Sequence, residues 1–158
     1  MHSFEIHTDC SDIRKAHLVD TPVPVAGPGQ AVVRIEGFAL TTNNVTYAAT
    51  GDVIGYWKFF PTGIKGQGIV PVWGFARVTD SQSETLKTGD RLYGFFPMAS
   101  HMVITPTARG SSNVIDAAPH RKDLPIVYNT YRRVEAADPA SDARRALFQP
   151  LLVTSYLL

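Results

Sequence analysis

The sequence predicts a mainly β fold, a partly open β-barrel with short helices that is followed by a helical segment toward the C-terminal end. Short stretches of alternating apolar and polar residues recur along most of the chain, and glycine and proline turns separate them. The strongest helix start, Asp-Pro at residues 138–139, lies near the end of the sequence. Short strands at regular spacing are typical of barrels, and we expect about eight of them.

The clearest strand lies in the first third of the chain. Alternation predicts two early strands at residues 3–8 and 16–19. The stretch TPVPVAGPGQ (21–30) must be a loop, because its three prolines and two glycines interrupt helices and central strands. In the next stretch, AVVRIEGFAL (31–40), apolar and charged side chains alternate between two faces from Val33 to Glu36. We therefore expect a half-buried strand there.

A short helix and an aromatic loop follow this strand. We expect the helix from Asn43 to Thr50, with Thr41 or Thr42 as its cap and Gly51 at its end. The loop GYWKFFPTG (55–63) carries four aromatic side chains, which either plug one end of a barrel or line a pocket.

The later elements follow from the same signals. We expect, in chain order, paired short strands over 69–78, a Gly-Asp turn inside LKTGDRLYGFF (86–96), a strand in ASHMVITP (99–106), a loop over 111–119, extended or mixed structure over 124–131, and a helix from 138–139 to Pro150.

Composition excludes several classes of function. The formal net charge is +1 and no dense run of Lys or Arg occurs, so we expect no nucleic-acid partner. The longest apolar run has about eight residues, whereas a membrane-spanning helix needs about 20. The single cysteine, Cys10, and an N-terminal segment without an apolar core favour the cytoplasm.

The order of several segments resembles a known family. GQAVVRIEGFAL, ATG, WGFARVTDS, LKTGDRLYGF and SHMVITP follow one another between residues 29 and 106. This order resembles the N-terminal GroES-like catalytic domain of the medium-chain dehydrogenase/reductase superfamily, especially its zinc-independent quinone oxidoreductases and enoyl reductases. PVWGFARV and VYNTYRRVEA also resemble an uncharacterised bacterial branch of that superfamily.

The resemblance implies a domain organisation. Residues 1–136 would form the GroES-like barrel, and 137–158 would be a helical connector to a Rossmann domain that the sequence does not contain. The closing PLLVTSYLL is similar to such connecting helices, although it could also fold back onto its own barrel. NAD(P)H is implied for the full-length protein. No G-x-G-x-x-G occurs in these residues, so we expect no cofactor bound to them alone.

The same comparison argues against zinc. Zinc-bearing relatives use a Cys on the short helix and a His-Glu pair before the next strand. This sequence has Asn43 and Asn44 on the helix and Trp73-Gly74 in place of the pair. We therefore expect no metal site.

Without a metal, a reductase of this kind needs a hydrogen-bond donor for the substrate oxygen and an apolar pocket. The candidate catalytic donors are Tyr47 and Asn44; the candidate substrate-binding residues are Tyr56, Trp57 and Trp73; the candidate cofactor contacts are Asn43, Tyr128 and Asn129. Each has a structural alternative. The aromatic residues could be core, the helix asparagines could be caps, and Asn129 could be a turn residue.

We therefore expect the substrate-binding domain of a zinc-independent, NAD(P)H-dependent oxidoreductase that reduces an enone, a quinone or an aldehyde. These 158 residues alone should be inactive. The expected partners are a small-molecule substrate and the Rossmann domain, and assembly into a homo-oligomer stays open. The alternative is a stand-alone barrel that serves as a binding or assembly module without catalysis.

Overall fold

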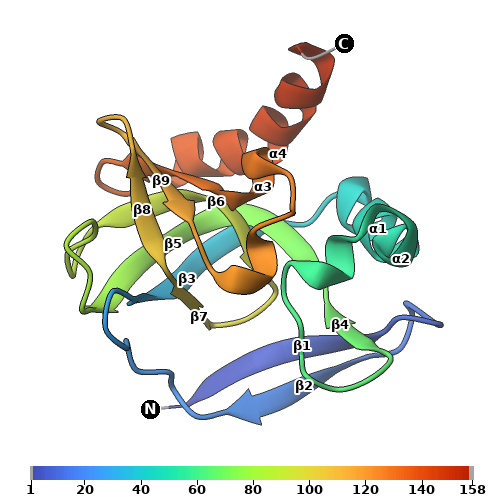
Figure 1. Cartoon of the computed structure of the whole chain (residues 1–158). Coiled ribbons are helices and arrows are strands. Elements are labelled where there is room, and N and C mark those ends of the chain that lie inside the picture. The colour runs from blue at the N-terminus through green and yellow to red at the C-terminus, as the bar shows by residue number, and fades with distance from the viewer. Residues whose placement is uncertain (1, 157–158) are drawn as a thin grey trace.

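Two antiparallel sheets form most of the structure (Figure 1), a computed structural model that describes residues 2–156, with side chains as far as 152. The smaller sheet has the strand order β2-β1-β4 and the larger one the order β7-β3-β5-β6-β10-β9-β8. The strands are β1 (Ser3–Asp9), β2 (Ala16–Thr21), β3 (Ala31–Ala39), β4 (Gln67–Ile69), β5 (Pro71–Ser81), β6 (Arg91–Pro97), β7 (His101–Ile104), β8 (Pro106–Arg109), β9 (Asn113–Asp116) and β10 (Thr130–Val134).

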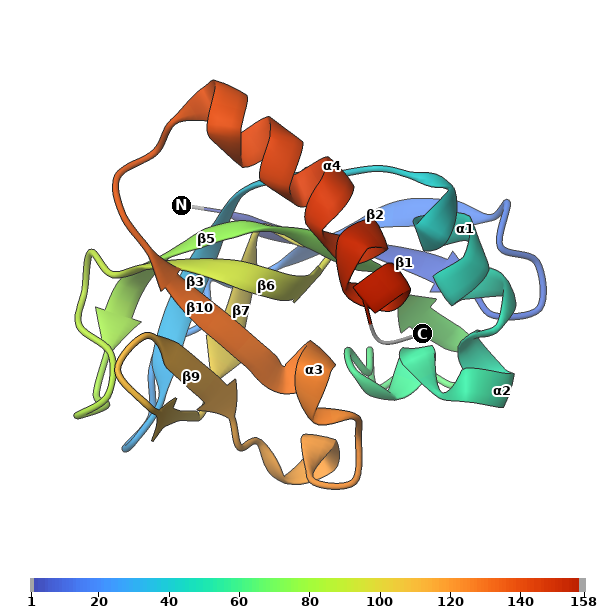
Figure 2. The same cartoon turned by 90° about the horizontal axis from the view of Figure 1, so that it is seen from above.

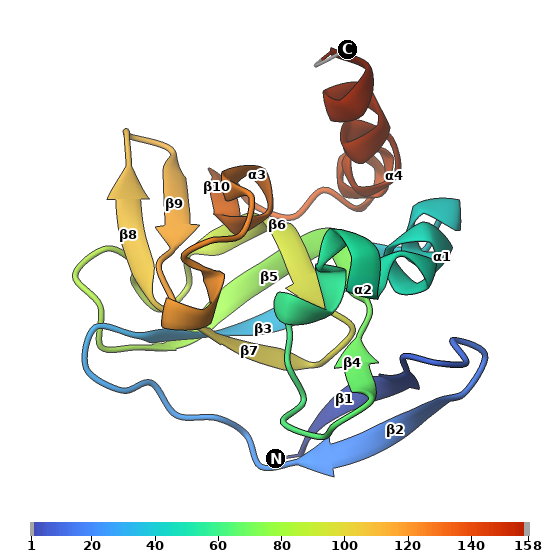
Figure 3. The same cartoon turned by 45° about the vertical axis from the view of Figure 1, so that its right-hand side comes forward.

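Short helices cover the ends and one face of the larger sheet (Figures 1 and 3). They are α1 (Thr42–Ala49), α2 (Gly51–Ile54), the 3₁₀ turns η1 (Tyr56–Lys58) and η2 (Pro119–Arg121), α3 (Ile126–Asn129) and the longer α4 (Pro139–Tyr156). The prediction of a mainly β, barrel-like fold with short helices is confirmed. None of the described helices is long and apolar enough to cross a membrane.

Several predicted elements differ from the observed ones because strands pair with distant partners. The expected pair of strands over 69–78 is wrong, since β4 pairs with β1 while β5 runs on to Ser81. The expected loop over 111–119 contains β9, which pairs with β8 and β10. Hydrogen bonding and packing against neighbouring strands decide such short segments, and a local pattern does not contain that information.

Strand β3 contains an irregularity that aims a carboxylate across the sheet. Ile35 pairs with Ala76 and Gly37 with Phe75, so Glu36 is an extra residue in the ladder between β3 and β5. An extra residue of this kind is a β-bulge, which bends its strand and redirects a side chain. The Glu36 carboxylate reaches Arg77 at 2.7 Å and Arg91 at 2.6 Å.

This carboxylate is needed because three arginines lie in one cross-strand row. Arg34 pairs with Arg77, and Arg77 pairs with Arg91. Like charges directly opposite each other destabilise a sheet. Burial would raise the pKa of Glu36, but hydrogen bonds from Arg91 and then Arg77 outweigh it and lower that pKa below its ordinary value. Glu36 is therefore ionised at neutral pH and balances part of the row.

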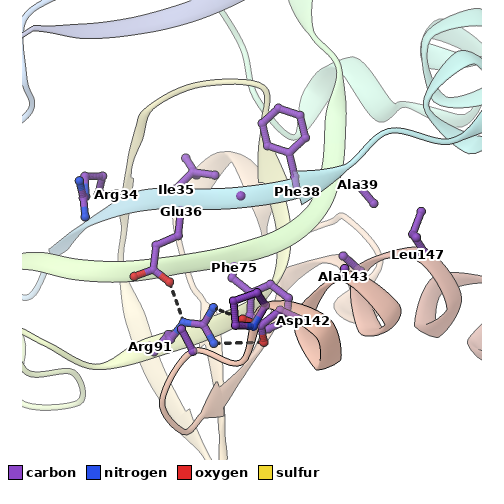
Figure 4. Close-up of a pocket in the computed structure, with 14 residues that line it drawn as sticks. Arg34, Ile35, Glu36, Phe38, Ala39, Phe75, Arg91, Asp142, Ala143 and Leu147 are labelled. Atoms are coloured by element: carbon purple, nitrogen blue, oxygen red, sulfur yellow. Dashed lines mark hydrogen bonds and ion pairs between the residues drawn. The ribbon is translucent and has the colours of Figure 1, made fainter.

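A second carboxylate in the same network attaches α4 to the sheet. Asp142, in the first turn of α4, accepts hydrogen bonds from both Nη atoms of Arg91 at 2.7 and 3.3 Å (Figure 4). One turn later Ala146 is buried against Phe75 and Tyr93. The first half of α4 thus packs on the barrel, whereas farther along Phe148 is 57% exposed. Figure 2 shows α4 changing direction toward its C-terminal end, and Pro150 lies inside this helix.

Strand β5 approaches the bulged part of β3 closely at Gly74. A Cβ at Gly74 would lie 2.3 Å from the carbonyl oxygen of Gly37, a backbone atom that cannot move aside. Gly74→Ala should therefore lower the free energy of unfolding by about 1–3 kcal/mol, as overpacking does. Gly37→Ala is the matched control, because a Cβ there meets nothing within 4 Å. Urea denaturation checks both variants, and equal effects would contradict the packing argument.

The attachment of α4 depends on the Asp142 carboxylate. Asp142→Asn leaves the guanidinium of Arg91, whose side chain is only 5% exposed, without one of its two carboxylates. We expect a loss of about 1–3 kcal/mol in the free energy of unfolding. Asp12→Asn removes a carboxylate from a surface ion pair with Arg14 and should change stability by about 0.5 kcal/mol or less. Thermal and urea unfolding measure both; a neutral Asp142→Asn would show that apolar packing alone holds the helix.

Candidate functional site

Four of the eight predicted site residues meet in one aromatic cluster. Tyr47 of α1, Tyr56 of η1, Trp73 of β5 and Tyr128 of α3 all surround Phe95 of β6. Their ring centroids lie between 4.6 and 6.4 Å from that of Phe95. We call these four side chains the phenol cluster. They come from segments far apart in the sequence, and the fold alone brings them together.

Two hydrogen bonds orient the polar tips of the phenol cluster. The indole Nε1–H of Trp73 donates to the hydroxyl of Tyr47 at 3.3 Å. The hydroxyls of Tyr56 and Tyr128 lie 3.1 Å apart, so one of them donates to the other. Tyr47 thus accepts a hydrogen bond, and no acceptor for its own proton is found among the described residues. This phenol retains a proton to donate.

Local sequence explains the position of Tyr47. Thr41 caps α1 by accepting from the backbone N–H of Asn43, and the Asn44 side chain accepts from the Thr41 N–H at 2.7 Å. The amide nitrogen of Asn44 then donates to the carbonyl oxygen of Pro71, at the start of β5, at 2.8 Å. Residues three apart on a helix share a face, so Tyr47 points toward the same strand. The capping residues set both the start and the rotation of the helix.

Burial keeps these phenols protonated. Desolvation raises the pKa of Tyr47, only partly offset by the hydrogen bond from Trp73. Desolvation also raises the pKa of Tyr128, and the hydrogen bond with Tyr56 adds to the effect. A phenol already has a reference pKa of about 10. Both phenols are therefore neutral at physiological pH, and Tyr47, whose proton has no acceptor among the described residues, is suited to stabilise negative charge on an oxygen.

The other four candidate residues do not join the cluster. Trp57, a candidate substrate-binding residue, is buried between Gly51 and Gly68, in a separate cluster with Ala48 and Val70. Asn44 is placed beside Tyr47, but both ends of its amide are bonded to backbone groups.

The asparagines assigned to the cofactor also lie elsewhere. Asn129 is buried at the end of α3, and its amide donates to the carbonyl oxygens of Arg121 and Leu124, so its polar group is used within the structure. Asn43 is half-buried in the first turn of α1, where its backbone N–H is capped. Of the residues assigned to the cofactor, only Tyr128 lies in the phenol cluster.

Sequence reasoning missed Arg121, which organises the loop beneath the cluster. Its side chain is 1% exposed, and its Nε lies 3.3 Å from Asp116 as an ion pair without hydrogen-bond geometry. It also donates to the Tyr131 hydroxyl at 2.9 Å and to the carbonyl oxygen of Phe59 at 3.3 Å. The segment PHRKD has the composition of an exposed loop, so no local signal could have found this residue.

Two hollows lie near this site. A groove of about 720 Å³ separates α4 from β3 and contains the Glu36–Arg91–Asp142 network (Figure 4). A second cleft of about 520 Å³ borders Trp73 between α3, β10 and α4. No group of three or more His, Cys, Asp or Glu side chains placed to hold a metal occurs in the described part of the chain.

The buried phenols generate a prediction about alkaline pH. The pKa of Tyr131 is raised to about 12, and those of Tyr47, Tyr93 and Tyr128 are raised as well, so all four ionise later when folded. Unfolded tyrosines lose their protons near pH 10, so stability should fall as pH rises above about 10. Ultraviolet titration of phenolate should show a late phase that Tyr128→Phe diminishes. A single step near pH 10 with the protein still folded would contradict this.

Comparisons with known proteins place the chain in a family. A search of curated proteins finds no match. Among solved structures, a quinone oxidoreductase from Coxiella burnetii is similar with 16% identity and a TM-score of 0.43, over 82% of this chain and 40% of that chain. At this identity and score the likeness does not show a shared activity. The family model described as "Protein of unknown function (DUF2855)" matches residues 38–158, most of the chain, and the protein therefore belongs to that family.

Proposed function

We propose that this chain is the substrate-binding domain of a zinc-independent, NAD(P)H-dependent oxidoreductase of the cytoplasm that reduces an enone, a quinone or an aldehyde. The observation that carries the proposal is the Tyr47 phenol, which accepts from Trp73 and keeps its own proton available. Phenols and an indole are poor zinc ligands compared with thiolate, imidazole and carboxylate, so the residue types of this cluster support a metal-free reaction.

Each residue of the phenol cluster has a role in this proposal. Tyr47 would donate a hydrogen bond to the substrate carbonyl oxygen, where negative charge develops during reduction. The rings of Tyr56, Trp73 and Tyr128 would hold the flat substrate and exclude water. NAD(P)H would supply the hydride. Since the sequence has no glycine-rich phosphate turn, the nucleotide would be held mainly by a domain outside these residues.

A specific observation favours a second candidate function. Tyr47 and Tyr56 are each only 8% exposed, which is also what core residues show. The chain would then be a binding or assembly module whose aromatic cluster serves stability. The two candidates differ in whether the hydroxyl of Tyr47 affects a reaction rate or only the free energy of unfolding.

The test is reduction by the full-length natural protein, supplied with NADPH and a panel of enones, quinones and aldehydes. Tyr47→Phe removes the donor and keeps the ring, so kcat should fall about 10²–10³-fold while NADPH binding is unchanged. Absence of both NADPH binding and turnover would refute the proposal. A fully active Tyr47→Phe variant would remove the role given to this phenol.

A further inference from the structure

The cleft of about 520 Å³ beside Trp73 is built by one cross-strand row of side chains. Arg109 of β8 pairs with Asn113 of β9, Asn113 with Arg132 of β10, and Arg132 with Tyr93 of β6. Directly paired residues point to the same face of a sheet. All four side chains therefore line the same cleft, as the lining residues show.

The row places two arginines within reach of one ligand. Adjacent strands lie about 4.8 Å apart, so the backbones of Arg109 and Arg132, two strands apart, are separated by about 10 Å. Arg109 is also anchored, because its Nη1 donates to the hydroxyl of Thr130 at 3.2 Å. Two long guanidinium side chains at this separation can converge on a single anionic group.

Among the residues whose side chains are described, none balances the positive charge of the cleft. No acidic residue of that set lines it, and neither Arg109 nor Arg132 forms an ion pair within it. Arg132 also borders a neighbouring hollow that contains Glu135, Asp138 and Asp142. Asp142 is already bonded to Arg91, and the other two form no ion pair with Arg132.

An apolar wall completes the cleft. The ring of Trp73 stacks on that of Tyr93, with the centroids 5.8 Å apart and 26° between the planes. Tyr93 is only 2% exposed, so Trp73 supplies the aromatic surface of the cleft. Ile126 and Val127 of α3 add apolar surface that is 51% and 37% exposed. Flat apolar surfaces of this kind pack against aromatic ligands. The volume lies within the usual range of small-molecule sites, about 300–1,000 Å³.

We propose that this cleft binds a small aromatic molecule that carries a carboxylate or a phosphate group. The anionic group is held by Arg109 and Arg132, and the ring lies against Trp73 and the exposed apolar side chains of Ile126 and Val127. The inference goes beyond the proposed reductase function and does not rest on it, because binding here requires neither NADPH nor the Tyr47 phenol. The two sites share only Trp73.

Calorimetric titration of the purified protein tests the proposal with four probes: 1-naphthoate, 1-naphthyl phosphate, the neutral 1-naphthalenemethanol and inorganic phosphate. At least one of the two aromatic anions should bind at least tenfold more tightly than the neutral alcohol and than inorganic phosphate. Its affinity should fall as salt is added, because ions screen the attraction. The better of the two anions identifies the group, carboxylate or phosphate, that the arginines prefer.

Matched variants locate the binding. Arg109→Gln and Arg132→Gln, both at exposed positions, should each weaken the preferred anion at least tenfold and leave circular dichroism unchanged. Arg14→Gln is the control, because Arg14 is exposed and lies in an ion pair with Asp12 outside the cleft. The proposal is overturned if neither aromatic anion binds, if the neutral alcohol or inorganic phosphate binds equally well, or if both cleft variants bind like the wild type. The calorimetric test measures binding and no turnover. A failed reductase test would therefore not change the interpretation of binding in this cleft.

Discussion

Strands β5 and β6 pair so that Arg77 lies opposite Arg91, Phe75 opposite Tyr93 and Trp73 opposite Phe95. This register puts charged, then apolar, then indole and phenyl side chains in order along one face of the sheet. A shift by one residue would turn all of them to the other face. Glu36 and α4 meet the charged end, and the phenol cluster forms at the aromatic end. The docking of α4 and the candidate site are therefore consequences of the same pairing.

The charged end shows how the fold accommodates an unfavourable arrangement. Three aligned arginines would repel one another, and two carboxylates from different elements lie among them. One carboxylate belongs to the bulged residue Glu36 and the other to Asp142 in the first turn of α4. Since the Arg91 side chain is almost fully buried, both partners are needed to compensate its desolvation. Helix attachment is thus coupled to charge balance in the sheet as well as to the burial of Ala146.

The aromatic end connects two sites through one indole. Trp73 donates to the hydroxyl of Tyr47 in the phenol cluster, and its ring stacks on Tyr93 at the wall of the cleft. Tyr47 does not line the cleft, so Trp73 is the one side chain that belongs to both sites. The position of this indole is therefore set by the phenol cluster on one side and by Tyr93 on the other.

The sequence by itself determined the mainly β character, the capped start of α1 and the helix that begins at Pro139, because alternation, capping and Asp-Pro signals act over a few residues. It also singled out the four side chains of the phenol cluster. Only the tertiary structure decided which strands pair, why Arg121 is buried, and that the amides of Asn44 and Asn129 are bonded to the backbone. Those outcomes depend on partners many residues away, whose register is set by packing of the whole sheet and is not encoded in any short segment.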